Sequence, residues 1–248
     1  GVPVPTVILS GHSDGLGSRS FSITERMQGE TIARKILRDT EWQKARENLL
    51  QDMAKALAAI HKIDKNQFEE IELNDIRDPL TSLRSIYSAL EDPHPTFDYA
   101  FRWLEANQPE ISESTFVHGD FRLGNLLIDT SGLNAVLDWE IAQFGDPMQD
   151  LGWMCVRAWR FGHHQPVAGI GSYEELLESY ALESGRNISN AMLVWWVIFG
   201  TLRWGVICLQ MGGDFRKGRT NSLEIAAIGR RVAENEYDLL QAIGESKK

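Results

Sequence analysis

The sequence predicts an α+β fold in which helices dominate and strands are few and short. Strand-like alternation occurs at the start of the chain, in residues 1–9 and 19–26, and again in short runs within residues 114–139. Apolar residues recur at helical spacing over residues 40–108 and from residue 147 to the end. These observations place two small strand regions in a largely helical chain.

The first 29 residues are predicted to form a hairpin. Pro3 and Pro5 indicate that the front of the first strand is a lead-in or an edge, because proline cannot donate to a sheet ladder. Gly11, Gly15 and Gly17 lie between the two strands and are interpreted as a turn rather than a phosphate-binding loop. An isolated hairpin is marginal in water, so we expect the pair to belong to a larger sheet whose other strands lie outside this sequence.

Three helices are predicted to follow the hairpin. Thr40 is the expected N-cap of the first, which ends near His61, and His61 is interpreted as a buried structural histidine. Two further helices begin at Pro79 and Pro95, since proline is favoured in the first turn of a helix. The residues expected to form the apolar stripes of these helices are Leu49, Met53, Leu57, Ile60, Leu83, Ile86, Leu90, Phe97, Ala100, Phe101 and Leu104.

Charge and composition narrow the classes of function. The 248 residues contain 25 Lys and Arg against 35 Asp and Glu, a formal net charge of −10. This balance argues against nucleic acid as a partner, because binding to the phosphate backbone needs a surplus of basic residues. Cys155 and Cys208 lie in apolar runs and are predicted to be reduced core residues. With no signal peptide visible, these cysteines predict a cytoplasmic location.

The most apolar stretch, residues 191–211, is long enough to span a bilayer. Arg203 lies near its middle, however, and a central arginine costs about 2.5–3.5 kcal/mol on insertion scales. Gly200 and Gly205 permit close packing of helices. We therefore predict a buried C-terminal helix and no membrane partner.

A cluster of carboxylate, amide and guanidinium residues lies in the central strand region. Arg122 and Asn125 follow Asp120 by two and five positions, and Asp138 ends the hairpin that begins at Leu126. Phosphoryl transfer requires a carboxylate to accept or orient the attacking hydroxyl, oxygen ligands for Mg²⁺, and a cation near the transferred group. Although a single Asp in a loop is usually a turn or cap residue, this spacing predicts a magnesium-dependent phosphoryl-transfer site.

The segments His118–Asn125, Asp138–Glu140 and Gly145–Asp150 resemble the aminoglycoside phosphotransferase and choline kinase-like family, a branch of the protein-kinase-like fold. In the residues of these motifs they are most similar to the phosphotransferase domains associated with acyl-CoA dehydrogenase-like proteins. The resemblance extends from the first hairpin to about Met211. It implies a phosphotransferase, or kinase, that uses ATP and Mg²⁺ and has an alcohol group as its acceptor.

The resemblance also implies a two-lobe architecture. Residues 1–29 would be the remnant of an N-terminal nucleotide-binding lobe with its hinge, and residues 30–248 the C-terminal catalytic and acceptor-binding lobe. The Gly-rich loop, strand lysine and helix glutamate of the family's N-terminal lobe have no counterpart in this sequence. We therefore expect a fragment that binds ATP weakly, and a longer gene product that binds it better.

The family pattern further implies individual roles, carried onto the matching positions. Asp120 would be the catalytic base, and the backbone of the hinge would bind adenine. Asp150 would begin the following helix and brace the catalytic loop through backbone hydrogen bonds. The implied roles are catalytic for Asp120 and Arg122, metal-binding for Asn125 and Asp138, cofactor-binding for Glu25 and Met27, and structural support of the loop for His118 and Asp150.

The acceptor is predicted to be a hydroxyl of a small molecule, either a metabolite, including a hydroxyacyl thioester, or an aminoglycoside-like antibiotic. The residues expected to contact it are Glu140, Trp153, Arg157 and Trp159, with Arg160, His163 and His164 in the same region. The alternative is a nucleotide-binding pseudokinase or scaffold without turnover. A protein kinase is disfavoured by Gly119 and by Trp139-Glu140, which stand where protein kinases have Arg and Phe-Gly.

Overall fold

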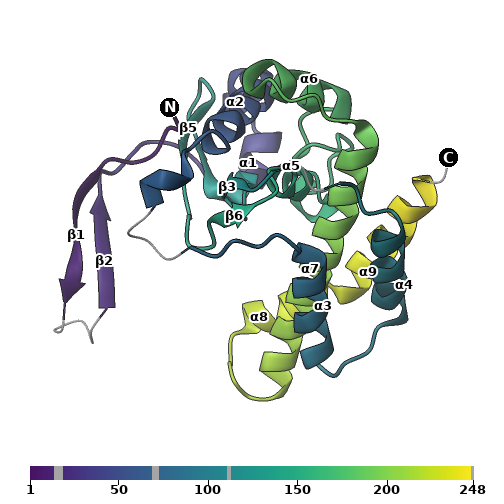
Figure 1. The fold of residues 1–248 in the computed structure, drawn as a ribbon. Coiled ribbons are helices and arrows are strands. Elements are labelled where there is room, and N and C mark those ends of the chain that lie inside the picture. Colours follow the sequence, from purple (N-terminus) through teal and green to yellow (C-terminus); the bar gives the residue numbers. More distant parts are fainter. Residues whose placement is uncertain (14–18, 69–72, 111–112, 247–248) are drawn as a thin grey trace.

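The computed structural model describes residues 1–13, 19–68, 73–110 and 113–246, and within them the chain forms nine α-helices and three two-stranded antiparallel sheets (Figure 1). This architecture confirms the α+β class, with helices dominant. The helices are α1 Ala33–Arg38, α2 Gln43–Ile60, α3 Pro79–Ala89, α4 Pro95–Ala106, α5 Met148–Met154, α6 Tyr173–Ser184, α7 Asn190–Arg216, α8 Leu223–Gly229 and α9 Val232–Glu245. The strands are β1 Val7–Ser13, β2 Arg19–Thr24, β3 Thr115–Val117, β4 Leu126–Ile128, β5 Leu133–Val136 and β6 Gln143–Gly145.

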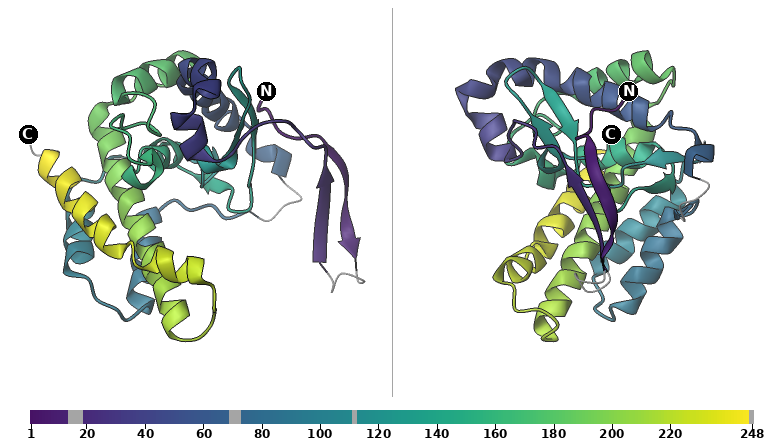
Figure 2. Two further views of the ribbon diagram at one scale, coloured as in Figure 1. Left: turned by 180° about the vertical axis from the view of Figure 1, so that it is seen from behind. Right: turned by 90° about the vertical axis from the view of Figure 1, so that its left-hand side faces the viewer.

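The β1–β2 hairpin projects away from the helical body, as two opposite views of the molecule show (Figures 1 and 2). Its strands pair from Val7 with Thr24 to Ser13 with Arg19, which confirms the predicted hairpin. Gly11 was expected in the turn, but it pairs with Phe21 inside the ladder, because β1 continues to Ser13. Residues 14–18, where the other two glycines of the predicted turn fall, lie outside the described residues.

Two backbone contacts join the ends of the hairpin to the central strands. Glu30 and Ile128 exchange hydrogen bonds, with N···O distances of 2.8 and 3.0 Å. The Val136 amide donates to the Pro3 carbonyl at 2.8 Å. The segments that enter and leave the hairpin therefore flank the β4–β5 sheet, while the hairpin itself extends outward.

The central strands agree with the predicted runs at β3 and β4. The third run was expected at residues 135–137, whereas β5 ends at Val136 and pairs antiparallel with β4. Strand β6 was not predicted, because Gln143–Gly145 is short and lacks an alternating pattern. It pairs with β3, so that β3 and the segment after Asp138 are held side by side.

Helices α2, α3 and α4 confirm the three predicted helices with two differences. Thr40 is not an N-cap, because Thr40–Trp42 forms a 3₁₀ turn, η2, and α2 begins after the buried Trp42. Ile86 was expected in an apolar stripe but is 48% exposed, since α3 buries the face that carries Leu80, Leu83 and Tyr87.

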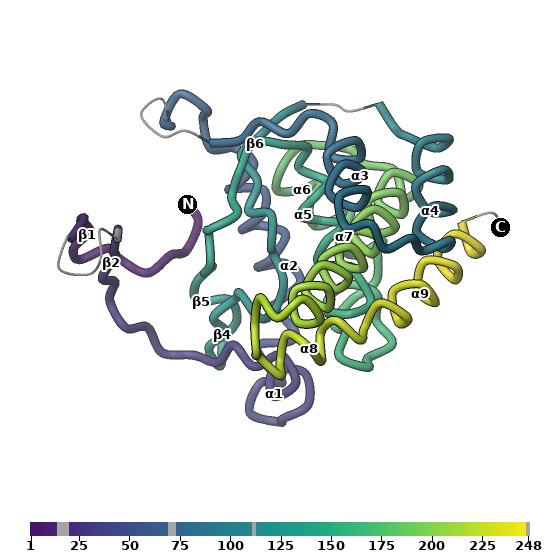
Figure 3. The backbone as a smooth tube through the Cα atoms, turned by 90° about the horizontal axis from the view of Figure 1, so that it is seen from below, coloured from purple at the N-terminus to yellow at the C-terminus, as the bar shows by residue number. Residues whose placement is uncertain are grey.

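Helix α7 is the central core helix of the C-terminal half, packed against α3, α4, α5, α8 and α9 (Figure 3). By length and composition it could cross a membrane, but 78% of its most apolar window is buried inside the protein. Its backbone approaches α5 closely: a Cβ on Gly152 would lie 2.6 Å from the Trp196 backbone carbon. Cys208 on α7 and Cys155 at the end of α5 are buried and free, as predicted.

Candidate active site

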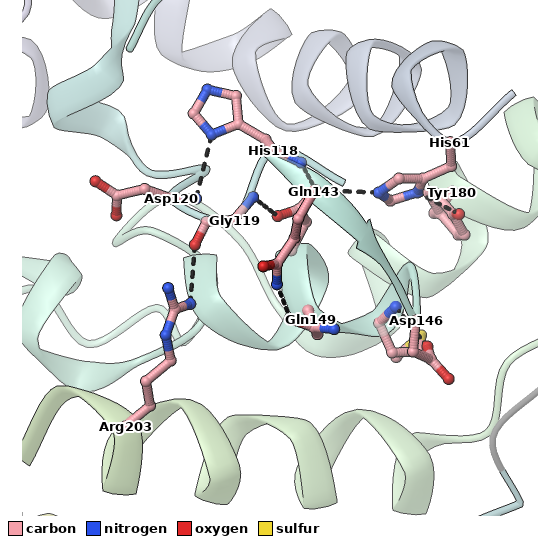
Figure 4. Close-up of polar contacts among 11 residues, drawn as sticks. His61, His118, Gly119, Asp120, Gln143, Asp146, Gln149, Tyr180 and Arg203 are labelled. Carbon is pink, nitrogen blue, oxygen red and sulfur yellow. Dashed lines mark hydrogen bonds and ion pairs between the residues drawn. The ribbon is translucent and has the colours of Figure 1, made fainter. Parts of the chain in front are cut away.

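The segment after β3 forms a tight loop from His118 to Asn125, closed by the 3₁₀ turn η4, Leu123–Asn125 (Figure 4). Gly119 adopts φ +81°, in the left-handed region that favours glycine. A Cβ at this position would lie 2.7 Å from the Ile141 carbonyl oxygen. The chain therefore requires glycine between the histidine and the aspartate of the loop.

The fully buried carboxylate of Asp150 holds the backbone of this loop. Its Oδ2 accepts from the His118 amide and its Oδ1 from the Gly119 amide, both at 2.8 Å. Behind it, His61 Nε2 lies 3.2 Å from Oδ2, and His61 Nδ1 lies 2.8 Å from the Tyr180 hydroxyl. Asp150 lies in the first turn of α5, so one side chain fixes the loop relative to a helix, and α2 and α6 support that side chain.

The hydrogen-bond donors around the Asp150 carboxylate lower its pKa by more than burial raises it. Burial alone would raise the pKa of the Asp150 carboxyl, but the hydrogen bonds from His61 and from the His118 amide lower the pKa below its ordinary value. Hydrogen bonds to an ionised carboxylate are among the stronger ones in proteins. The brace on the loop is therefore charge-assisted.

His118 connects the loop to the strand that precedes Asp138. Its Nε2 donates to the Leu137 carbonyl at 2.9 Å, and its Nδ1 accepts from the Asp120 amide at 3.2 Å. These partners fix the neutral tautomer that carries the proton on Nε2, since a carbonyl only accepts and an amide only donates. The imidazole is thus engaged at both ring nitrogens in the framework of the loop.

The Asp120 carboxylate is held by three donors from three places in the chain. Trp153 Nε1 on α5 and Arg122 Nε donate to its Oδ1, at 2.6 and 3.0 Å, and Asn125 Nδ2 donates to its Oδ2 at 2.6 Å. The carboxylate is only partly buried. Every partner is a donor, so the group is oriented as an acceptor at the edge of the loop.

Arg203 reaches from α7 to the same loop, and its role was not predicted. Its Nη1 donates to the Gly119 carbonyl at 2.9 Å (Figure 4). Its guanidinium lies 4.6 Å from the centroid of the Trp153 ring. Burial lowers the pKa of Arg203, while the charges of Asp120 and Asp150 act in the opposite direction. The signal in the sequence was a lone charge in an apolar stretch, which a purely structural helix would not need.

Asp138 lies two residues beyond β5, exposed and with φ +63°. A non-glycine residue in this region is uncommon and is often found at functional sites. The Leu137 amide donates to the Asn125 carbonyl at 2.9 Å, so the segment carrying Asp138 is tied to the end of the catalytic loop. The structure thus brings Asp120, Asn125 and Asp138 to one region.

The donor set of this region fits a hard cation held jointly with phosphates. Among the described residues, no hydrogen bond or ion pair engages the Asp138 carboxylate or the Asn125 amide oxygen. No group of three or more His, Cys, Asp and Glu able to hold a metal occurs in the described part of the chain. Mg²⁺ usually takes one or two carboxylates and completes its shell with phosphate and water, so the available oxygens suit it.

The predicted hinge residues lie apart from this cluster, after β2. The Glu25 carboxylate accepts from the Thr6 amide and hydroxyl at 3.1 and 2.9 Å, and the Glu25 amide donates to the Thr6 carbonyl. Met27 is partly buried. No described contact joins either residue to the catalytic loop, so their adenine-binding role stays a prediction.

The predicted acceptor residues separate into a buried and an exposed group. Trp153 and Trp159 are 3% and 6% exposed; Trp153 binds Asp120, and Trp159 lies beneath the Arg122 guanidinium at 4.9 Å. Arg157 is exposed, with its Nε 3.5 Å from an Asp238 carboxylate oxygen. Glu140 is also exposed. The two tryptophans are therefore buried beside Asp120 and Arg122 and do not form an exposed surface.

The comparisons with known proteins agree with this geometry. Residues 1–184 match the profile described as "Phosphotransferase enzyme family". Mouse acyl-CoA dehydrogenase family member 10 is 28% identical over 205 residues, covering 75% of this chain and 19% of that protein. Hygromycin-B 4-O-kinase of Escherichia coli is 29% identical over 170 residues, covering 60% of this chain and 46% of that protein. The chain thus spans about a fifth to a half of the length of these relatives.

Solved structures with the same fold include a protein of Ralstonia eutropha, with TM-score 0.80 and 22% identity over 98% of this chain and 79% of that one. The aminoglycoside phosphotransferase APH(4)-Ia, solved with AMP-PNP and hygromycin B, has TM-score 0.64 and 20% identity over 99% and 78%. These likenesses show the kinase-like phosphotransferase fold.

Proposed function

The chain belongs to the phosphotransferase enzyme family, and from that premise we propose that it transfers the γ-phosphoryl group of ATP to a hydroxyl of a small molecule. Asp120 acts as the base. The observation that carries the proposal is the Asp120 carboxylate, which three donors orient at the partly open edge of a loop that Asp150 braces.

Asp120 accepts or orients the proton of the attacking hydroxyl. Trp153 and Asn125 hold the two carboxylate oxygens in place, so little reorganisation is needed when the hydroxyl arrives. The Arg122 guanidinium, 3.0 Å from Oδ1, adds positive charge beside the group that is transferred. In this arrangement positioning and electrostatics supply the rate enhancement, as in other phosphoryl transfers.

Asn125 and Asp138 would hold Mg²⁺ through the amide oxygen and the carboxylate. When bound, the ion neutralises charge on the nucleotide phosphates. Asp138 is exposed, its backbone is left-handed, and its carboxylate has no described protein partner. The nucleotide is inferred from the neighbours, because APH(4)-Ia was solved with AMP-PNP and a structural relative with GDP.

Two classes of acceptor remain as candidates within the proposal. Hygromycin-B 4-O-kinase is named for an antibiotic acceptor, and another structural relative was solved with kanamycin. The acyl-CoA dehydrogenase family members instead favour a metabolite. Glu174, Glu175 and Glu178, a set that a polycationic antibiotic would need near the site, are exposed on α6, where Glu175 forms the helix cap with Ser172.

Asp120→Asn tests the proposal, with ADP release measured over a panel of hydroxyl acceptors. The variant keeps the shape of the side chain but removes the base, so we expect acceptor-dependent turnover to fall about 10²–10⁴-fold. Asp98→Asn on α4 makes the same chemical change outside the loop and should retain full turnover. Acceptor-dependent ADP release that persists in Asp120→Asn would overturn the mechanism, and nucleotide binding without turnover by any acceptor would favour a pseudokinase.

A further inference from the structure

A large cleft lies beside the turn that carries Trp159. Its volume is about 1190 Å³, and it is formed by α1, by the 3₁₀ turn η5 (Arg157–Arg160) with the loop after it, and by the start of α9. Its basic and imidazole side chains are Arg34, Arg157, Arg160, Arg231, His163 and His164. The acidic side chains in its lining are Glu234 and Asp238.

The charge of this cleft is opposite to that of the chain. Four guanidinium groups face two carboxylates, whereas the whole chain has a formal net charge of −10. Arg231 pairs with Glu234 at 2.9 Å, and Arg157 approaches Asp238 at 3.5 Å. Among the described residues, no carboxylate lies within ion-pair distance of Arg34 or Arg160. The charge of Arg160 also acts on the Asp238 carboxylate, so the lining as a whole carries two more guanidinium groups than carboxylates.

Arg160 is held in position before any ligand arrives. Its Nε and Nη2 donate to the Cys155 carbonyl at 3.2 and 2.9 Å, and Nη2 also lies 3.3 Å from the Tyr173 hydroxyl. These are neutral acceptors, so they orient the guanidinium without cancelling its charge. Among the described contacts of Arg160, none uses its Nη1 group, so a positioned guanidinium nitrogen is available to donate to a phosphate.

The cleft adjoins the catalytic loop through η5. Trp159 packs beneath Arg122, whose Nε contacts the Asp120 carboxylate, while Arg157 and Arg160 of the same turn line the cleft. The turn η5 thus contributes residues both to the surroundings of Asp120 and to the basic cleft. The left-handed backbone at Phe161 and Gly162, with φ 48° and 90°, turns the following loop along the cleft wall.

From this geometry we propose that the cleft binds a phosphate group carried by the acceptor, away from the hydroxyl that is phosphorylated. A phosphate ester carries close to two negative charges at neutral pH, which matches the excess of two guanidinium groups over carboxylates in the cleft. The inference rests on the proposed function, since it names the class of acceptor for that site. It disfavours a polycationic acceptor, which this surface would repel.

Calorimetric titration with inorganic pyrophosphate tests binding without catalysis. The buffer contains no magnesium, so that a metal–nucleotide site does not contribute. We expect saturable binding that weakens about tenfold in Arg34→Gln and in Arg160→Gln, because each loses a charge-assisted contact. Arg102→Gln on α4 is the matched control and should bind as the parent chain does. Equal weakening in all three variants, or none in the cleft variants, would overturn the proposal.

A paired acceptor screen distinguishes a phosphate on the acceptor from free phosphate. Each hydroxyl compound is offered both as the free alcohol and as its phosphate ester at another position, with ADP release as the readout. The cleft variants should raise KM for the esters about tenfold and leave the preference between alcohols unchanged. Pyrophosphate binding without any preference for esters would overturn the acceptor role. Turnover that survives Asp120→Asn would instead overturn the proposed function and leave the binding result standing.

Discussion

The His118–Asn125 loop and the β1–β2 hairpin are both short segments next to the small central sheets. The loop is held by many contacts with the rest of the protein, whereas the hairpin has few. Asp150 on α5 accepts from the His118 and Gly119 amides of the loop, and His61, which follows α2, supports the Asp150 carboxylate. Arg203 on α7 donates separately to the Gly119 carbonyl. The hairpin carries Ile8, Leu9 and Ile23 at 50–67% exposure and has few contacts with the body (Figure 2). The difference shows that the stabilising contacts of this chain are concentrated around the His118–Asn125 loop and not around the hairpin.

Among the variants considered, Asp150→Ala is expected to lower the free energy of unfolding most, because it removes the support of the loop. It leaves the His118 and Gly119 amides and the His61 ring without their buried acceptor. Leaving such groups unpaired costs about 3 kcal/mol or more, and we expect that loss in the free energy of unfolding measured with urea. Asp150→Asn, which keeps one acceptor oxygen, should lose less. A loss below about 1 kcal/mol in Asp150→Ala would contradict the brace.

The acid dependence of stability sharpens the same comparison. Burial opposes ionisation of Asp150, but its hydrogen bonds lower the folded-state pKa below the ordinary 3.8. A lowered carboxyl pKa stabilises the fold above the unfolded value, and this stabilisation is lost as the pH falls through the folded value. The difference in unfolding free energy between the parent chain and Asp150→Asn should therefore be constant above about pH 5 and shrink below about pH 4. A difference that grows on acidification would show the opposite sign.

The smallest expected effect belongs to the hairpin. Ile8 is 67% exposed, so Ile8→Thr should change the free energy of unfolding by less than about 0.5 kcal/mol. Ile128→Thr on β4 is the matched change at a fully buried strand position and should cost about 2 kcal/mol or more. Chemical denaturation of the two variants side by side gives both values. Equal losses would mean that the hairpin is packed as firmly as the central strands.

Local pattern predicted much of the fold. The stripes of α2 and α4 and the runs at β3 and β4 could be read from the sequence because spacing and flanking residues agreed there. Strand β6 could not, since three residues acquire strand geometry only by pairing with β3. The prediction for Ile86 was wrong because the buried face of α3 is set by its packing against α4 and α7, which the spacing within α3 does not specify.

The candidate site shows the same division. The positions of Asp120, Asn125 and Asp138 followed from one contiguous motif and its hairpin. The contacts of His61 and Arg203 did not, because His61 and Asp150 are 89 residues apart, and Arg203 and Gly119 are 84. The acceptor contact of Trp153 stays a prediction, whereas the hydrogen bond from its indole N–H to Asp120 was not predicted. Long-range partners of this kind require the folded arrangement.

The two buried cysteines supply internal reporters of opening. Burial raises the pKa of Cys155 and of Cys208 to about 12, so almost no thiolate exists in the folded chain near neutral pH. A thiol reagent can then label either residue only when its surroundings open. Cys155 lies between α5 and η5 and Cys208 within α7, whereas the hairpin contains no cysteine. The labelling rates would therefore report how fast the helical body opens and would not respond to fraying of the hairpin.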